Sequence, residues 1–293
     1  MTLLASTDLP RLTAARAPLT RPVEVQDEHG QRQTIQIPAE RPLTVFVDKR
    51  ELVTLMTLGA EPELLVLGYL RNQRLVASVR DIESITVDWE VGAAAVKTRA
   101  GIEDFDRKTA KRVVTTGCGQ GTVFGGLMDE LHAVSLPSAA AARISQRALY
   151  ALLEAVRRQE STYKSAGSVH GCAIFGIAGD DAVLELFVED VGRHNAIDTL
   201  AGWMWLRGVS GADKAFYTTG RLTSEMVIKS AQMGVPIVVS RSGITQMGHD
   251  LATRLGLALF GRAMNRHFLC YSGFDRFDSE PALAQPPRVA PQA

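Results

Sequence analysis

The hydrophobic and polar positions change their period halfway along the chain, and the first half follows a strand-like pattern. Residues 43–58, LTVFVDKRELVTLMTL, form two β-rich runs around the polar turn Asp48-Lys49-Arg50, which predicts a hairpin. Pro62 precedes apolar residues at helical spacing through residues 64–70, so a short helix is expected to begin there. IESITVDW, GAAAVKTR and RVVTT predict further strands, so the first half is expected to be β-rich.

The second half alternates strands with single helices. The clearest helix is expected at residues 138–160, with Pro137-Ser138 at its N-cap. Further helices are predicted at 194–206, 223–233 and 245–255, and strands at HGCAIFGI, AVLELFVED, KAFYTT, PIVVS, LALFG and HFLCYS. Single helices between successive strands are typical of βα crossovers. This order predicts a largely parallel sheet with both faces covered.

These two patterns predict two domains with loose ends. A β-rich N-terminal domain is expected at residues 21–136 and an α/β domain at 137–275. Residues 1–20 and 276–293 lack a core-forming pattern, and we expect both segments to be disordered. The chain has 293 residues, of which 46% are hydrophobic, and this is enough for two cores.

The charge balance and the cysteines narrow the class of protein. Lys and Arg together number 32, as do Asp and Glu, so no overall charge attracts nucleic acid or an anionic membrane. No run approaches the ~18 apolar residues of a membrane span, and no signal peptide is expected. Cys118, Cys172 and Cys270 are spaced unlike a disulfide framework or a metal-ligand set. We therefore expect a soluble, cytoplasmic protein with no resident metal.

One cysteine stands in a glycine-rich stretch, TTGCGQGTVFGG at residues 115–126. Cys118 suits a reactive thiol on a sterically open loop, but these residues would also form a tight turn around a small, semi-apolar side chain. Cys172 and Cys270 lie within apolar runs and are expected to be core residues. The loop alone leaves both interpretations open.

Three strand ends of the second half run into similar loops before a helix. EDVGRHNA, TTGRLTSE and SRSGITQ each supply a glycine, an arginine and small polar side chains. Such loops gather at the carboxyl edge of an α/β sheet, where helix N-termini and Arg193, Arg221 and Arg241 favour an anion such as a nucleotide or pyrophosphate. Helix capping alone would explain each loop separately. The sequence contains neither a P-loop nor a dinucleotide-binding fingerprint.

His170 and His194 are further candidates at these strand and helix ends, although either would also serve as a structural histidine. A zinc deaminase requires H-x-E and P-C-x-x-C, and the sequence contains no P-C-x-x-C. We therefore expect no catalytic zinc. A nucleotide or base hydrolase would lack the metal or general base that it needs.

Taken in order, TTGCGQG, SVHGCA, FVEDVGRHNAIDTLAG, TTGRLTSEMVIKSAQMGVPIVVSRS and LFGRAMNRHFLCYSG resemble the FdhD family of formate dehydrogenase accessory sulfurtransferases. The resemblance implies an α/β fold, with a cytidine-deaminase-like, three-layer C-terminal domain and a smaller β-rich N-terminal domain that ends in the Cys118 loop. It also implies sulfur delivery. Family members pass persulfide sulfur from a cysteine desulfurase to the bis-guanine-dinucleotide molybdenum cofactor, which then enters formate dehydrogenase.

The resemblance extends to individual positions. Cys118 matches the persulfide-bearing cysteine, and the family suggests a homodimer. Cofactor binding is implied at the end of the penultimate strand, at Arg262, Ala263, Met264, Asn265, Arg266 and His267. The anion loops add Gly192, Arg193, His194, Asn195, Gly220, Arg221 and Ser240 as candidate contacts. Mo-bis(molybdopterin guanine dinucleotide) would be bound there as a substrate, and the catalytic subunit of formate dehydrogenase would receive it.

The sequence departs from the family at one position. Many members carry C-x-x-C, whereas this chain has Gly121 in place of the second cysteine. A local disulfide and any two-thiol mechanism are thereby excluded. The chain would act through a single thiol or, alternatively, as a chaperone that binds and delivers the cofactor without moving sulfur.

Overall fold

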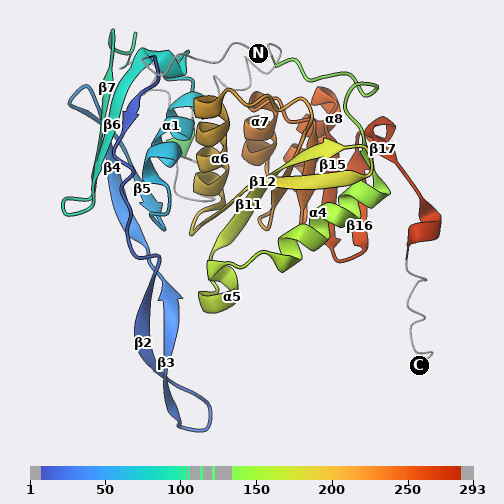
Figure 1. Ribbon diagram of the computed structural model, residues 1–293, viewed down its shortest axis with the longest axis horizontal. Coiled ribbons are helices and arrows are strands. Elements are labelled where there is room, and N and C mark those ends of the chain that lie inside the picture. Colours follow the sequence, from blue (N-terminus) through green and yellow to red (C-terminus); the bar gives the residue numbers. More distant parts are fainter. Residues whose placement is uncertain (1–7, 104, 106–112, 115–120, 123–133, 285–293) are drawn as a thin grey trace.

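The chain folds around two β-sheets that lie on either side of packed helices (Figure 1). The computed structural model describes residues 8–103, 105, 113–114, 121–122 and 134–284. The first sheet has the order β1-β6-β7-β4-β5 and the second the order β12-β11-β13-β14-β15-β16. The α/β class and the β-rich first half that the sequence predicted are confirmed.

The first sheet is built from short strands that bury one face. Its strands are β1 (Arg11–Leu12), β4 (Arg41–Val47), β5 (Arg50–Thr57), β6 (Ile82–Asp88) and β7 (Ala93–Thr98). Alternate residues of β4, namely Leu43, Val45 and Val47, face the core, and α1 (Pro62–Asn72) covers them. The predicted hairpin is confirmed as β4–β5, with Asp48 and Lys49 in the left-handed conformation at its turn.

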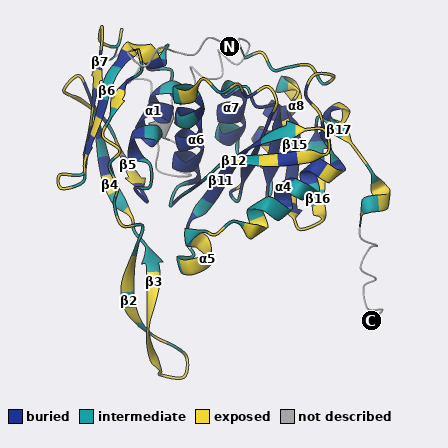
Figure 2. Ribbon diagram, in the orientation of Figure 1, coloured by how far each residue is buried: buried dark blue, intermediate teal, exposed yellow. Residues whose placement is uncertain are grey.

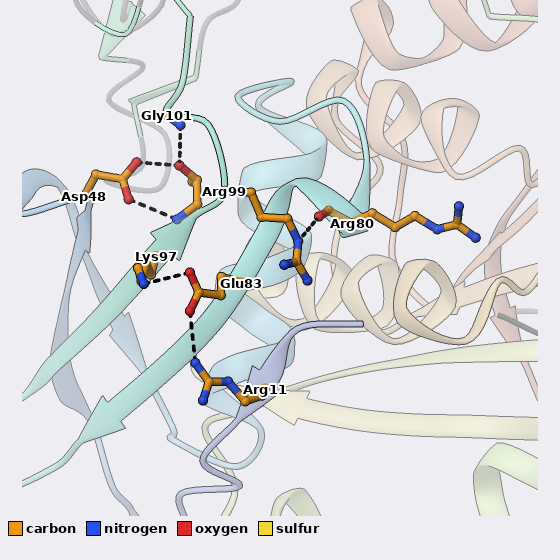
Figure 3. A network of polar contacts seen from close by, with 8 residues as sticks. Arg11, Asp48, Arg80, Glu83, Lys97, Arg99 and Gly101 are labelled. Atoms are coloured by element: carbon orange, nitrogen blue, oxygen red, sulfur yellow. Dashed lines mark hydrogen bonds and ion pairs between the residues drawn. The ribbon is translucent and has the colours of Figure 1, made fainter. Parts of the chain in front are cut away.

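Polar contacts fasten the outer face and rim of this sheet (Figure 3). Glu83 accepts from Arg11 at 3.1 Å and pairs with Lys97 at 2.7 Å, so that the short strand β1 is held beside β6. The hydrogen bond from Lys97 is the main cause of the lowered pKa of Glu83. Asp48 accepts from the backbone and the hydroxyl of Thr98, which closes the turn over β7.

A separate hairpin projects from the body of the molecule (Figure 1). It consists of β2 (Thr20–Gln26) and β3 (Arg32–Pro38), and most of its residues are exposed (Figure 2). Val23 lies opposite Ile35, so both side chains stand on one face of this two-stranded ribbon. Beyond α5 (Thr162–Ala166), which contacts β3, little of the body supports the ribbon.

The second sheet is mixed rather than largely parallel, which corrects the sequence-based expectation. Its strands are β11 (His170–Ala178), β12 (Asp181–Asp190), β13 (Lys214–Thr218), β14 (Ile237–Ser240), β15 (Ala258–Met264) and β16 (His267–Ser272). Only the β13–β14 and β14–β15 pairs are parallel. β12 and β16 each follow a two-residue turn, which is too short for a crossover, and they therefore pair antiparallel with β11 and β15.

Helices cover both faces of the second sheet and give three layers. On one face lie α6 (Arg193–Arg207), α7 (Ser224–Gln232) and α8 (Gln246–Leu255), and on the other lies α4 (Gln146–Arg158). The three helices predicted at 194–206, 223–233 and 245–255 are confirmed to within one residue at each end. None of the helices in the described ranges is long and apolar enough to cross a membrane.

The helix predicted at 138–160 is shorter than expected. It begins at Gln146, where the Ser145 hydroxyl accepts from the Ala148 amide at 3.1 Å, and the proposed N-cap at Ser138 is wrong. The guanidinium of Arg276 donates to the carbonyls of Pro137, Ser138 and Ala142, and it holds this turn against the C-terminal segment. β10 (Ile144–Ser145) then pairs with β17 (Phe277–Asp278).

The expected disorder of both ends is also wrong for the residues that the structure describes. Residues 8–20 run along the first sheet, where the Thr13 hydroxyl donates to Glu63 at 2.5 Å and the Ala15 amide donates to the same carboxylate. Residues 276–284 contain β17 and a short 3₁₀ turn, Pro281–Leu283. The buried carboxylate of Glu63 thus holds the N-terminal segment, and the buried guanidinium of Arg276 belongs to the C-terminal one. Neither segment has an apolar period of its own.

Candidate functional site

The three glycine- and arginine-containing loops meet at one edge of the second sheet. β12, β13 and β14 all end there, and His170 begins the antiparallel strand β11 at the same edge. The Arg241 amide donates to the Thr218 carbonyl at 3.0 Å, which joins the second and third loops. A Cβ added to Gly220 would lie 2.8 Å from Cδ of Arg193, so the first loop packs directly on the second. The predicted gathering of the loops is confirmed, and ligand binding there stays a prediction.

Positive charge collects on the side of this edge that faces α6 and α7. Burial lowers the pKa of His170, and the charges of Arg193 and Arg221 lower it further. Arg221 is exposed, whereas Arg193 is buried. Burial also lowers the pKa of His194 to about 2, and its imidazole is therefore neutral at physiological pH. This side offers fixed positive charge beside two neutral imidazoles.

The α4 side of the same edge contains a pocket of about 260 Å³. Phe187 and Tyr217 supply aromatic surface, and Arg241 lies over the Tyr163 ring at 5.7 Å. Burial raises the pKa of Tyr217 to about 12, so its hydroxyl keeps its proton. A flat ring could stack on such a surface while the guanidinium of Arg241 held an anionic group.

The segment predicted to bind cofactor is divided between this pocket and the surface. Ala263, Met264 and Asn265 line the pocket. Arg262 and His267 are exposed but do not line it, and Arg266 lies over the Tyr150 ring of α4. Arg262 and Asn265 have positive φ values of 51° and 57°, a conformation that non-glycine residues seldom adopt. The backbone is held in this shape by the bond from the Arg262 amide to the Ser242 carbonyl at 2.8 Å.

Two of the predicted contact residues use their side chains to support the loops. The Asn195 amide is buried and donates to the Met56 carbonyl and to Asp190. The Ser240 hydroxyl donates to the Gly220 carbonyl at 2.7 Å and accepts from the Ser242 amide. Their side chains therefore position the neighbouring loops, which carry the arginines.

Asp190 is the site residue that the sequence did not reveal. Its carboxylate accepts from the Thr57 hydroxyl and Leu58 amide of the first half, and from Gly192 and Asn195 of the second. Burial raises its pKa, and these donors oppose that shift. The residue stands inside the quoted EDVGRHNA motif, but only the tertiary structure shows that two of its donors come from the end of β5.

The cysteines in the described part of the chain are packing residues. Cys172 is fully buried in β11, where its thiol donates to Thr218 Oγ1 at 3.3 Å and burial raises its pKa to about 12. Burial raises the pKa of Cys270 to about 11. The core assignment is confirmed for Cys172, whereas Cys270 is half-buried and packs against the outside of a core. Cys118 lies outside the described residues, between β8 (Val113–Val114) and β9 (Gly121–Thr122), which pair antiparallel.

The sequence predicted no resident metal, and only the described residues can be searched for groups that could bind one. In the ranges that the structure describes, no group of three or more His, Cys, Asp or Glu side chains is placed to hold a metal ion. The donors at the sheet edge are arginines, amides and hydroxyls, which suit an anion rather than a cation.

Comparisons with known proteins agree with the resemblance. A family model described as the FdhD/NarQ family matches residues 38–278. The sulfur carrier protein FdhD of Bacillus subtilis is 33% identical over 238 residues, which are 81% of this chain and 88% of that protein. The protein of the same description from Listeria monocytogenes serotype 4b is 30% identical over 254 residues, with 85% and 95% covered.

A solved structure shows the same fold. The crystal structure of a protein described as a formate dehydrogenase accessory protein, from Desulfotalea psychrophila, superimposes with a TM-score of 0.70. The two sequences are 24% identical, and the alignment covers 89% of this chain and 100% of the other. At that identity, the likeness concerns the fold alone.

Proposed function

The chain belongs to the FdhD/NarQ family, and from that premise we propose that it is a sulfur carrier whose working thiol is Cys118. The sulfur would come from the persulfide of a cysteine desulfurase. It would pass to the bis-guanine-dinucleotide molybdenum cofactor before the cofactor enters the catalytic subunit of formate dehydrogenase. Relatives described as sulfur carriers, matched over most of their length, support this proposal.

The observation that carries the proposal is the state of the other two cysteines. Of the three in the sequence, Cys172 and Cys270 have raised pKa values, about 12 and about 11, because Cys172 is buried and Cys270 is half-buried. A thiol is nucleophilic only as the thiolate, so neither suits sulfur transfer at neutral pH. Cys118, between glycines and beside no bulky residue in sequence, is the remaining candidate.

The transfer step conserves charge and electrons. The Cys118 thiolate attacks the terminal sulfur of the donor persulfide, and a new S–S bond forms while the donor's S–S bond breaks. The donor leaves as a thiolate with the electron pair of the broken bond. Cys118 then holds the terminal sulfur as a persulfide, and no further oxidant or reductant is needed for this step.

We further propose that the cofactor's guanine nucleotide ends bind at the sheet edge. The aromatic surface of Phe187 and Tyr217 would take a base, and Arg241 and Arg221 would take phosphate oxygens. A homodimer would suit the two nucleotide ends of such a cofactor, and we keep it as part of the proposal. We also expect the carrier to work in the reducing cytoplasm.

Intact mass of the protein after incubation with a desulfurase and cysteine tests the carrier role. We expect the wild type to gain the mass of one sulfur, removable by dithiothreitol, and Cys118→Ala to gain none. Cys172→Ala and Cys270→Ala are the matched controls and should gain sulfur as the wild type does. Sulfur that persists on Cys118→Ala would move the chemistry to another cysteine and contradict the assignment.

Calorimetry with GDP tests the nucleotide site. Removing one charge-assisted phosphate contact costs about 1.5 to 3 kcal/mol, so Arg221→Ala and Arg241→Ala should each bind GDP roughly ten to a hundred times more weakly. Arg254→Ala, which removes an arginine from the last turn of α8, is the control. Unchanged affinity in both site variants would place the nucleotide elsewhere.

The alternative is a chaperone that carries the cofactor without moving sulfur. Gly121 in place of a second cysteine is the observation that favours it. A chaperone would bind GDP and gain no sulfur in the mass experiment, whereas a carrier would do both.

A further inference from the structure

A buried chain of polar side chains leads from α1 to the candidate site. Asn72 donates to Asp198 Oδ1 at 2.6 Å, and Lys229 Nζ donates to Asp198 Oδ2 at 2.8 Å. Lys229 also lies 3.7 Å from Glu225 Oε1, which in turn lies 3.4 Å from Nδ1 of His194. The chain therefore joins three helices, α1, α6 and α7, and ends on a histidine at the sheet edge.

The central ion pair is costly for the fold. The side chains of Asp198 and Lys229 are only 0% and 1% exposed, and taking two charges out of water costs several kcal/mol for each ion. Apolar side chains of the same volume would fill this space at no such cost. The ion pair is better explained by the position that it gives to Glu225, one helical turn before Lys229.

Three polar atoms at the end of the chain remain without a bond. His194 Nδ1, Glu225 Oε1 and Thr223 Oγ1 are buried and have no hydrogen-bond partner among the described residues. Buried polar groups are nearly always paired, and those that are not commonly mark functional sites. The 3.4 Å between His194 and Glu225 is longer than a good hydrogen bond, but such bonds often tighten when a site is filled.

Burial and the surrounding charges together keep His194 neutral. Lys229 and Glu225 face it from α7, Arg193 lies beside it on α6, and His170 approaches from β11. Burial is the main cause of its pKa of about 2, and the positive charges lower it further. A neutral imidazole has one N–H and one lone pair. A carboxylate oxygen can only accept, so Glu225 beside Nδ1 favours the tautomer with its hydrogen there.

We propose that Glu225 is a positioning residue, held in place by Lys229 and Asp198, that fixes His194 in the tautomer protonated on Nδ1. Nε2 of His194 then presents a lone pair and accepts a hydrogen bond from an N–H donor of the ligand. A pterin ring carries donors of this class, whereas a phosphate does not, and the guanine is already placed on Phe187 and Tyr217. The identity of the ligand rests on the proposed function, but the tautomer does not.

Nitrogen NMR of the six histidines in ligand-free protein tests this assignment, with His194→Gln used to identify the resonances. We expect wild-type His194 to be neutral with its hydrogen on Nδ1. Glu225→Gln, which preserves shape, should move the tautomer population toward Nε2–H. The double variant Asp198→Asn, Lys229→Met removes both charges of the pair and should shift the same equilibrium. Lys214→Met breaks a comparable ion pair, with Glu185 at 2.8 Å, and should leave His194 unchanged.

The possible outcomes are separable. Unchanged His194 resonances in folded Glu225→Gln would overturn the inference, whatever the nucleotide data show. Affinity for a free pterin should fall about tenfold in Glu225→Gln, and a normal affinity despite a changed tautomer would overturn the role of His194 as an acceptor. If the wild type does not bind GDP, the proposed nucleotide site fails, while the NMR result still decides whether Glu225 positions His194.

Discussion

Asp190 is the residue through which the first half of the chain reaches the candidate site. Four donors surround its carboxylate, two from the Thr57-Leu58 end of β5 and two from the start of α6. Burial would favour the neutral acid, and these donors stabilise the anion, so the carboxylate depends on both halves being in place. One side chain thus links the position of Arg193 to the first sheet.

Thiol reactivity is a prediction at this same scale. In Cys118→Ala, the two remaining thiols should resist iodoacetamide at pH 8 in the native state. With a pKa of about 12, Cys172 would be thiolate in roughly one molecule in ten thousand at that pH. Mass spectrometry of alkylated peptides, native and in urea, measures this.

The control for that experiment is the unfolded state, in which both thiols should react at ordinary rates. Labelling should rise with pH, and it should rise first at Cys270, whose pKa is about 11. Rapid native labelling of Cys172 at pH 8 would mean that β11 opens readily. Burial would then no longer exclude Cys172 as the thiol that carries sulfur.

At the scale of elements, local signals were predictable from the sequence and long-range ones were not. The starts of α6, α7 and α8 follow Gly192, Thr223 and Thr245, which are visible as local breaks in the apolar period, and the pattern located them to within one residue. The turn that precedes α4 is held by Arg276, more than a hundred residues away, and the pattern placed the start of this helix too early. The residues of the candidate site also differ in how far the sequence predicts them. Its arginine loops have a sequence signature, whereas the buried pair of Asp198 and Lys229 is visible only as two charges within apolar helices.

The contact between α1 and α6 gives a prediction at this scale. A Cβ on Gly202 would lie 2.0 Å from the Leu64 carbonyl oxygen and 2.9 Å from the Gly68 amide nitrogen. Alanine favours a helix over glycine by about 1 kcal/mol, but overpacking against backbone costs about 3 kcal/mol. Gly202→Ala should therefore lower the free energy of unfolding by about 2 kcal/mol, measured by urea denaturation.

The matched control is Gly243→Ala, where an added Cβ meets nothing within 4 Å and φ is not positive. That variant should unfold like the wild type. A stable Gly202→Ala protein would show that the two helices can separate at no cost, and the interlocking of the two halves would then need another cause.

At the scale of the whole molecule, the two halves share their cores. Trp205 and Leu206 of α6 pack into the core of the first sheet, while the rest of α6 covers the second sheet. The segment that carries Cys118 lies between these halves in the sequence, and the pairing of Val114 with Gly121 brings its two ends together.

The last prediction concerns Gly121, the position that separates the carrier from the chaperone. If one thiol suffices, the persulfide on Cys118 lasts until cofactor arrives, because no neighbouring sulfur can attack it to form a disulfide. Gly121→Cys should form a reducible bond to Cys118 under mild oxidation, seen as a loss of two free thiols. It should add little to the maturation of formate dehydrogenase in cells that lack their own carrier. Glu28→Cys, with the new thiol at an exposed position of the β2–β3 turn, is the control. A large gain in maturation from Gly121→Cys alone would mean that the natural loop transfers sulfur poorly, and the chaperone would then explain the family resemblance better.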